Sequence, residues 1–131
     1  MLYNTTDPYN WVLKKKILGQ NISWTVADMD VCVNEQFLIY CSINPIVNLL
    51  DLETLCTKQE TLNFAERGEE GNYFNHYGLM SVKFSGDTKE IVAGSKRSDI
   101  LIYDLLANRV STRVANSHDD EINSVCFANR M

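Results

Sequence analysis

Residues 91–127 read IVAGSKRSDILIYDLLANRVSTRVANSHDDEINSVCF, a stretch in which short apolar runs alternate with turn signals. The apolar runs are Ile91–Ala93, Ile100–Tyr103, Val110–Val114 and Ile122–Phe127. Polar residues separate them, for example the segments 96–99 and 117–121. Runs of four to six residues at such regular spacing predict a meander of antiparallel strands.

The chain also contains internal repeats. The segment 79–84 (LMSVKF) recurs at 122–127 (INSVCF), an offset of 43 residues. Upstream, 33–42 (VNEQFLIYCS) aligns with 86–95 (GDTKEIVAGS) at an offset of 53 residues, and the match continues until Leu50-Asp51 lies over Tyr103-Asp104. The ten extra residues fit in the polar segment 66–75. A fixed period of this length indicates a repeat architecture.

Repeats of about 40 to 45 residues that end near a Trp-Asp dipeptide are typical of WD repeats, in which four strands form one propeller blade. Leu50 and Tyr103 stand where the Trp would be. We therefore expect an all-β fold, a partial WD-repeat β-propeller with about two complete four-stranded antiparallel blades and strand remnants. The expected boundaries are 11–18 for the end of a preceding blade, 22–64 for the first blade, 79–115 for the second and 122–128 for the start of a third. Since propellers close with about four to eight blades, we expect the chain to be part of a longer protein.

The individual strands can be placed within these repeats. We expect residues 1–10 to form a loop or a frayed end and Asn34-Glu35 and Ser85-Gly86-Asp87 to form tight turns. The expected strands are 22–33, 37–42, 46–52, 57–64, 79–85, 91–95, 100–105, 110–115 and 122–127.

Composition narrows the classes of partner. The 131 residues carry 12 basic and 17 acidic side chains, a net charge of −5, which disfavours nucleic acid because phosphate binding needs clustered Lys and Arg. Lys14-Lys15-Lys16 is the one basic run, and we interpret it as a solvated strand edge. We expect no signal peptide, because the first residues lack a charged n-region and an apolar h-region. We also expect no membrane span, because the sequence has no run of 18 apolar residues. The expected localisation is intracellular, in the nucleus or cytoplasm.

The four cysteines, Cys32, Cys41, Cys56 and Cys126, form no CxxC pair. We expect buried free thiols rather than disulfides or a zinc site. No phosphate-binding loop, GxSxG or HExxH motif is present, so we expect no enzyme activity, no cofactor and no metal. The alternative from another class is an enzyme whose active site crosses the blade tips, which would need convergent polar groups with perturbed pKa values.

The chain resembles one WD-repeat family more closely, the family of WD repeat-containing protein twenty-three and the plant LEC-fourteen-B-like proteins. The residues that carry the resemblance are 24–28 (WTVAD), 42–47 (SINPIV) and 117–128 (SHDDEINSVCFA). The resemblance implies a substrate receptor of a cullin-RING ubiquitin ligase, which docks on the damaged-DNA-binding adaptor and presents client proteins for ubiquitination. A generic WD-repeat scaffold of another multiprotein complex is the alternative.

The adaptor-docking motif of the family, Trp-Asp-any-Arg, is absent. The nearest segments read LDLE at 50–53 and YDLL at 103–106. We therefore expect adaptor binding only in a full-length protein with later blades.

The resemblance also implies a structural hydrogen-bond network in each repeat. Its members here would be His76, Ser95, Tyr103 and His118, with His76 and His118 just before a first strand. Where the family has an Asp in the turn, this chain has Asn44 and Arg97, so the network is expected to be incomplete.

Loops between blades and between second and third strands lie on one face of a propeller, and polar loops on a rigid scaffold tend to carry function. A basic client segment would complement this face because its acidic residues outnumber its Lys and Arg; the alternative is that these loops are merely solvated. The candidate residues are Glu69, Glu70, Tyr73, Phe74, Asn44, Arg97, Asp119 and Asp120, with Tyr73 and Phe74 as apolar anchors.

Overall fold

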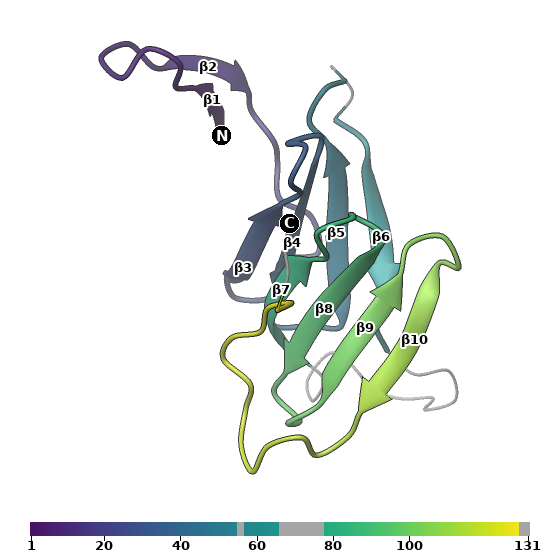
Figure 1. Cartoon of the computed structure of the whole chain (residues 1–131). Helices are drawn as coiled ribbons and strands as arrows, with labels where there is room; N and C mark the ends of the chain where they lie inside the picture. Colours follow the sequence, from purple (N-terminus) through teal and green to yellow (C-terminus); the bar gives the residue numbers. More distant parts are fainter. Residues whose placement is uncertain (55–56, 66–77, 129–131) are drawn as a thin grey trace.

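A computed structural model describes residues 1–54, 57–65 and 78–128, and every regular element in these ranges is a β-strand (Figure 1). The first sheet contains β3 (Val26–Val31), β4 (Phe37–Ser42), β5 (Ile46–Asp51) and β6 (Gln59–Asn63). The second sheet contains β7 (Leu79–Phe84), β8 (Glu90–Ser95), β9 (Ile100–Asp104) and β10 (Arg109–Val114). Both are antiparallel meanders, so the predicted all-β fold with two four-stranded sheets is confirmed. In the described ranges no helix could cross a membrane.

Tight turns connect the strands because the sequence supplies residues that tolerate them. The Glu35 N–H donates to the Cys32 carbonyl over 2.9 Å, and Glu35 has a φ of 59°. In the second sheet the Thr88 N–H donates to the Ser85 carbonyl over 3.1 Å, and the Ser85 hydroxyl donates to Asp87 Oδ1 over 2.7 Å. Both tight turns therefore form where the sequence predicts them.

The repeat is visible in the strand register. A β-bulge separates Val26 from Asp28 in the β3–β4 ladder, and a second separates Leu79 from Ser81 in the β7–β8 ladder. These positions differ by 53 residues in each case, the offset found in the sequence. A bulge is a defined structural feature, so its recurrence shows that the two sheets are repeats of one unit.

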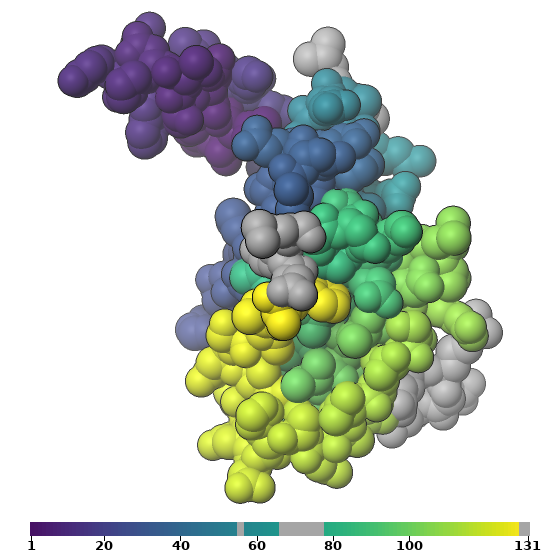
Figure 2. Space-filling view, in the orientation of Figure 1, coloured from purple at the N-terminus to yellow at the C-terminus, as the bar shows by residue number. Residues whose placement is uncertain are grey.

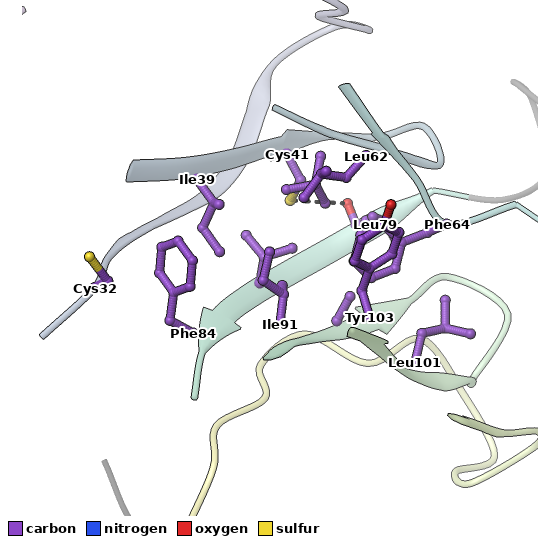
Figure 3. Close-up of a cluster of buried hydrophobic side chains, with 13 residues drawn as sticks. Cys32, Ile39, Cys41, Leu62, Phe64, Leu79, Phe84, Ile91, Leu101 and Tyr103 are labelled. Atoms are coloured by element: carbon purple, nitrogen blue, oxygen red, sulfur yellow. Dashed lines mark hydrogen bonds between the residues drawn. The ribbon is translucent and has the colours of Figure 1, made fainter. Parts of the chain in front are cut away.

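The core lies between the two sheets (Figure 3). The first sheet and its flanks contribute Cys32, Ile39, Cys41, Leu62 and Phe64, and the second contributes Leu79, Phe84, Ile91, Leu101 and Tyr103. The rings of Phe64 and Tyr103 stack with centroids 5.0 Å apart. Burial raises the pKa of the Cys41 thiol to about 12, so this thiol stays protonated at neutral pH. Burial, and after it the charge of Glu60, also raises the pKa of Tyr103.

Two carboxylates of β3 bind backbone N–H groups along the outer edge of β7, the strand at the edge of the second sheet. Asp28 Oδ2 accepts the Val82 N–H over 3.0 Å, and Asp30 Oδ2 accepts the Phe84 N–H over 2.8 Å. Ser81 stands at the Asp28 position of the second repeat, and its Oγ accepts the Val125 N–H over 3.2 Å. A side chain at this repeat position therefore links each unit to the next.

The ends of the chain differ from the predictions. Residues 2–4 were expected to be a loop but form β1 (Leu2–Asn4), which pairs with β2 (Val12–Lys15) in a hairpin. The strand expected at 11–18 is thus shorter, and among the described residues its hydrogen-bonded neighbour is β1. The backbone N–H and C=O groups of β2 can pair with any extended segment nearby, which explains why residues 2–4, close in sequence, pair with it.

The third-blade strand predicted at 122–127 is wrong, since the structure shows no strand there. A strand needs a hydrogen-bonded neighbour, and no other described segment provides one. The segment packs through single contacts instead: the Ile122 N–H donates to the Ser95 carbonyl over 3.1 Å, and Ile122 is buried. A Cβ added at Gly94 would lie 2.5 Å from Ile122 Cγ2, so glycine makes room for the segment on β8.

Candidate functional site

Loops from both sheets gather at one end of the molecule, and we call this end the loop face. Its described members are residues 20–25, 43–45, 96–98 and 115–121. Figure 1 shows the β4–β5 and β8–β9 turns and the segment after β10 at the lower end of the sheets. A Cβ added at Gly78 would lie 2.6 Å from Ile43 Cγ2 and 3.1 Å from Lys96 Cδ. The turns of the two sheets therefore meet at Gly78.

In the first sheet, buried polar side chains hold the segment that precedes β3. Asn44 is 1% exposed, and its Nδ2 donates to the Asn21 carbonyl over 2.7 Å while its Oδ1 accepts the Ile46 N–H over 2.9 Å. Asn48, fully buried in β5, donates from Nδ2 to the Gln20 carbonyl over 3.1 Å. Buried amides need partners, and here the partners are the backbone of residues 20–21. The amides therefore fix the position of this loop.

Ser42 completes this arrangement. Its Oγ accepts the Ser23 N–H over 2.7 Å and lies 2.7 Å from the Ser23 carbonyl and 2.6 Å from the Thr25 carbonyl. A single hydroxyl proton serves one carbonyl at a time. The residue between Ser23 and Thr25 is thus held from both sides.

In the second sheet an ion pair holds the segment that follows β10. Asp99 is 2% exposed, and its Oδ2 accepts Arg113 Nη2 over 2.6 Å and Nε over 3.0 Å. Its Oδ1 accepts the Asn116 N–H over 3.0 Å. Ser117 donates from its N–H to the Ser98 carbonyl over 2.8 Å, and Ser98 Oγ donates to the Asp120 carbonyl over 2.7 Å. Residues 116–120 are therefore ordered against the β8–β9 turn.

The structure separates the members of the expected repeat network. Ser95 Oγ accepts the N–H groups of Arg97 and Asp99, each over 3.2 Å, while the Tyr103 hydroxyl donates to Asn108 Oδ1 over 2.7 Å. His118 is exposed and, among the described residues, bonds to neither of them. The Tyr103 hydroxyl points to the β9–β10 turn because its ring stacks on Phe64. His76 lies outside the described residues.

The expected partner face is present only in part. Arg97, Asp119 and Asp120 are exposed on the loop face. Glu121 lies 3.7 Å from Lys96, whereas Asp119 and Asp120 have no ion-pair partner among the described residues. Asn44 must be corrected: it is buried and cannot contact a partner because its amide is used within the first sheet. Glu69, Glu70, Tyr73 and Phe74 lie outside the described residues.

Sequence reasoning missed two features of this face. Asn48 is a polar residue in the middle of an apolar strand, a signal that could have predicted its buried network. Trp24 belongs to the segment 22–33 that was expected to form one strand, but β3 begins at Val26 and the Trp24 side chain is 90% exposed. The period of the strand could not predict this because Trp24 precedes β3 and belongs to a turn.

No cluster of three His, Cys, Asp or Glu residues that could hold a metal occurs in the described parts of the chain. The described cysteines are free: Cys32 and Cys41 are buried, but Cys126 is exposed, contrary to the expectation of a buried thiol. Cys56 lies outside the described residues.

Comparison with solved structures identifies the architecture. The chain superposes on the crystal structure of RRP9 WD40 repeats with a TM-score of 0.61 and 14% sequence identity, covering 80% of this chain and 29% of that one. The structure of U3-55K gives a TM-score of 0.62 with 13% identity. The fold is that of WD40 repeats. Each four-stranded sheet is one propeller blade.

Sequence relatives agree with this fold. The chain is 35% identical to the LEC14B homolog of Prunus armeniaca over 97% of its own length and 27% of that protein. It is 30% identical to the DDB1- and CUL4-associated factor 11 homolog of Caenorhabditis briggsae over 79% of its length and 19% of that protein. The chain thus spans about a quarter or less of the curated relatives it matches. No family model matches it.

Proposed function

We propose that this chain is a protein-interaction module of a substrate receptor for a cullin-RING ubiquitin ligase, and that its loop face binds a basic segment of the client. The observation that carries the proposal is its similarity to a homolog of a DDB1- and CUL4-associated factor. Association with these two proteins is what that relative's name states. A binding role, rather than catalysis, also suits a WD40 scaffold, and the receptor role would place the chain in the nucleus or cytoplasm.

The charge of the loop face supports a basic client. Asp119 and Asp120 are exposed and have no ion-pair partner among the described residues. Among its described residues the loop face carries three carboxylates, Asp119, Asp120 and Glu121, and two basic side chains, Lys96 and Arg97. Opposite charges steer association and suppress wrong partners more than they raise affinity. Binding through this face should therefore weaken as salt increases.

The adaptor contact is expected elsewhere in the receptor. In both repeats the Asp of the final dipeptide is used inside its own turn: Asp51 Oδ1 accepts the Glu53 N–H and Asp104 Oδ1 accepts the Leu106 N–H, each over 2.9 Å. Neither segment contains the Arg of the docking motif. Residues 1–131 expressed alone should not retain the adaptor.

The test is affinity purification of the tagged protein, as it occurs in cells, with DDB1, CUL4 and co-purifying clients quantified. The Asp119→Lys/Asp120→Lys variant should retain DDB1 and CUL4 but lose clients, with a reduced salt dependence of client binding. The matched control is Asp87→Lys, an exposed carboxylate in the β7–β8 turn away from the loop face. Absence of DDB1 and CUL4 from the wild-type sample would favour a scaffold of another complex.

A further inference from the structure

Trp24 combines two features that a folded chain normally avoids. Its side chain is 90% exposed, and its backbone has a φ of 69°. A positive φ is uncommon for residues other than glycine and is an outlier for a bulky side chain. Trp is also a costly residue to leave in water, since its large ring normally stabilises cores and interfaces.

The backbone around Trp24 is held in place by the buried network of the first sheet. The Thr25 N–H donates to the Ser23 carbonyl over 2.9 Å, which closes a three-residue turn with Trp24 at its centre. With a positive φ at the central residue, this is the rare and strained form of the γ-turn. The hydroxyl of Ser42, fully buried, contacts both flanking carbonyls. Strain of this kind persists only when the surroundings fix it, and it is enriched at functional sites.

The described part of the fold gains nothing from a Trp at this position. Glycine would adopt the same φ without strain, and the ring covers little of the molecule's own surface. A residue that is both strained and unsupported by packing points to a contact with a surface outside the described part of the fold. Trp is also among the residues most enriched in binding hot spots.

The chemistry of that contact follows from the charge around it. Trp24 lies on the loop face, which also presents Asp119 and Asp120. Figure 2 shows the yellow-green residues that follow β10 over the lower part of the molecule, where this face lies, and the yellow residues after them nearer the middle of the view. The flat face of an indole attracts Lys and Arg, and Arg most often. An aromatic ring on the same face as carboxylates therefore suits a cationic side chain, with the ring giving contact area and the carboxylates giving attraction at longer range.

We propose that Trp24 is the aromatic anchor of the client site and receives an Arg or Lys side chain of a basic peptide segment against its indole face. This inference rests on the proposed interaction role of the loop face and adds its anchor residue. The γ-turn and Ser42 hold the ring in one place before the client arrives, so little ordering is required on binding.

The experiment uses the full chain and a fluorescein-labelled twelve-residue peptide of alternating Arg and Ser. A peptide with citrulline in place of Arg keeps the shape and removes the charge. Trp24→Gly should weaken binding of the Arg peptide at least tenfold and leave Tm unchanged or higher, because glycine relieves the positive φ. The matched control is Trp11→Gly, which removes another exposed Trp and should change affinity less than twofold.

The outcomes separate this inference from the proposed function. If Asp119→Lys/Asp120→Lys abolishes peptide binding while Trp24→Gly leaves it within twofold, the acidic face stands and the role of Trp24 is overturned. If the wild-type chain binds the Arg and citrulline peptides equally, both the anchor and the basic client are overturned.

A fall in Tm for Trp24→Gly would assign the residue to fold stability. Sedimentation showing self-association that Trp24→Gly removes would make the partner a second copy. Either result also overturns the proposal.

Discussion

At the residue scale, Asp28 shows how one side chain joins the two blades. Its Oδ2 accepts hydrogen bonds from the Ser81 hydroxyl over 2.8 Å, the Val82 N–H over 3.0 Å and Lys83 Nζ over 2.6 Å. Burial alone would raise the pKa of Asp28, but hydrogen bonds from Lys83, Val82 and Ser81 outweigh it and hold the pKa below 3.8. The carboxylate is therefore charged at neutral pH and serves as an acceptor for the edge of β7.

Replacing Asp28 by Ala should lower the free energy of unfolding by about 1 to 3 kcal/mol, because it leaves the Lys83 ammonium and a buried N–H without their acceptor. Asp28→Asn, the conservative control, keeps an oxygen for the Val82 N–H and should cost less. Because the folded pKa is depressed, the contribution of the charge is present above the unfolded value of about 3.9 and is lost as pH falls through the folded pKa. Urea unfolding at a series of pH values from 7 to 2 measures how the free energy of unfolding depends on pH. If the difference in free energy of unfolding between wild type and Asp28→Asn does not decrease as the pH falls, the charge of Asp28 does not make this contribution.

At the element scale, the strands of both blades could be predicted from the sequence because each pairs with its sequence neighbour. When strands pair with their sequence neighbours, the alternation of apolar residues and turn signals is sufficient to place them. The shared bulges show that the 53-residue alignment was correct. The segment 122–127 has the same pattern but forms no strand, because the pattern does not supply a neighbour. Asn44 and Trp24 could not be placed from the sequence for a related reason: burial of a turn residue depends on which segments pack over it.

The packing of residues 122–125 on β8 depends on the absence of a side chain at Gly94. Gly94→Ala should destabilise the chain by about 1 to 3 kcal/mol, since the added methyl group overlaps Ile122. The loss should be local: amide hydrogen exchange should become faster in 116–127 while β4, β5 and β8 stay protected. In the double variant Gly94→Ala/Ile122→Ala, the two effects should be less than additive because the smaller residue makes room. Additive effects would show that Gly94 does not hold this segment.

At the scale of the whole molecule, one side of the first blade is open. Val26, Met29 and Val31 are 40%, 57% and 38% exposed, whereas their repeat equivalents Leu79, Val82 and Phe84 are fully buried between the blades. The chain exposes 8664 Å² in total, compared with roughly 7,000 Å² for a compact monomer of this mass. The open side of the first blade, where the second blade shows that a neighbouring sheet would pack, is one source of this excess.

The isolated chain of 131 residues should consequently be marginally stable and prone to associate. We expect a Tm below about 60 °C, within or below the usual range of mesophilic domains, and an apparent mass that rises with concentration in sedimentation experiments. Open apolar faces of repeat proteins and unpaired strand edges both favour such association. Met29→Lys should reduce this association without lowering Tm, since the side chain is more than half exposed and a charge on an edge strand opposes pairing. Trp24→Gly is the control, since it alters the loop face and leaves the β3 edge intact. A monomer at every concentration, with a cooperative melt above about 60 °C, would show that the open side of the first blade causes neither association nor low stability.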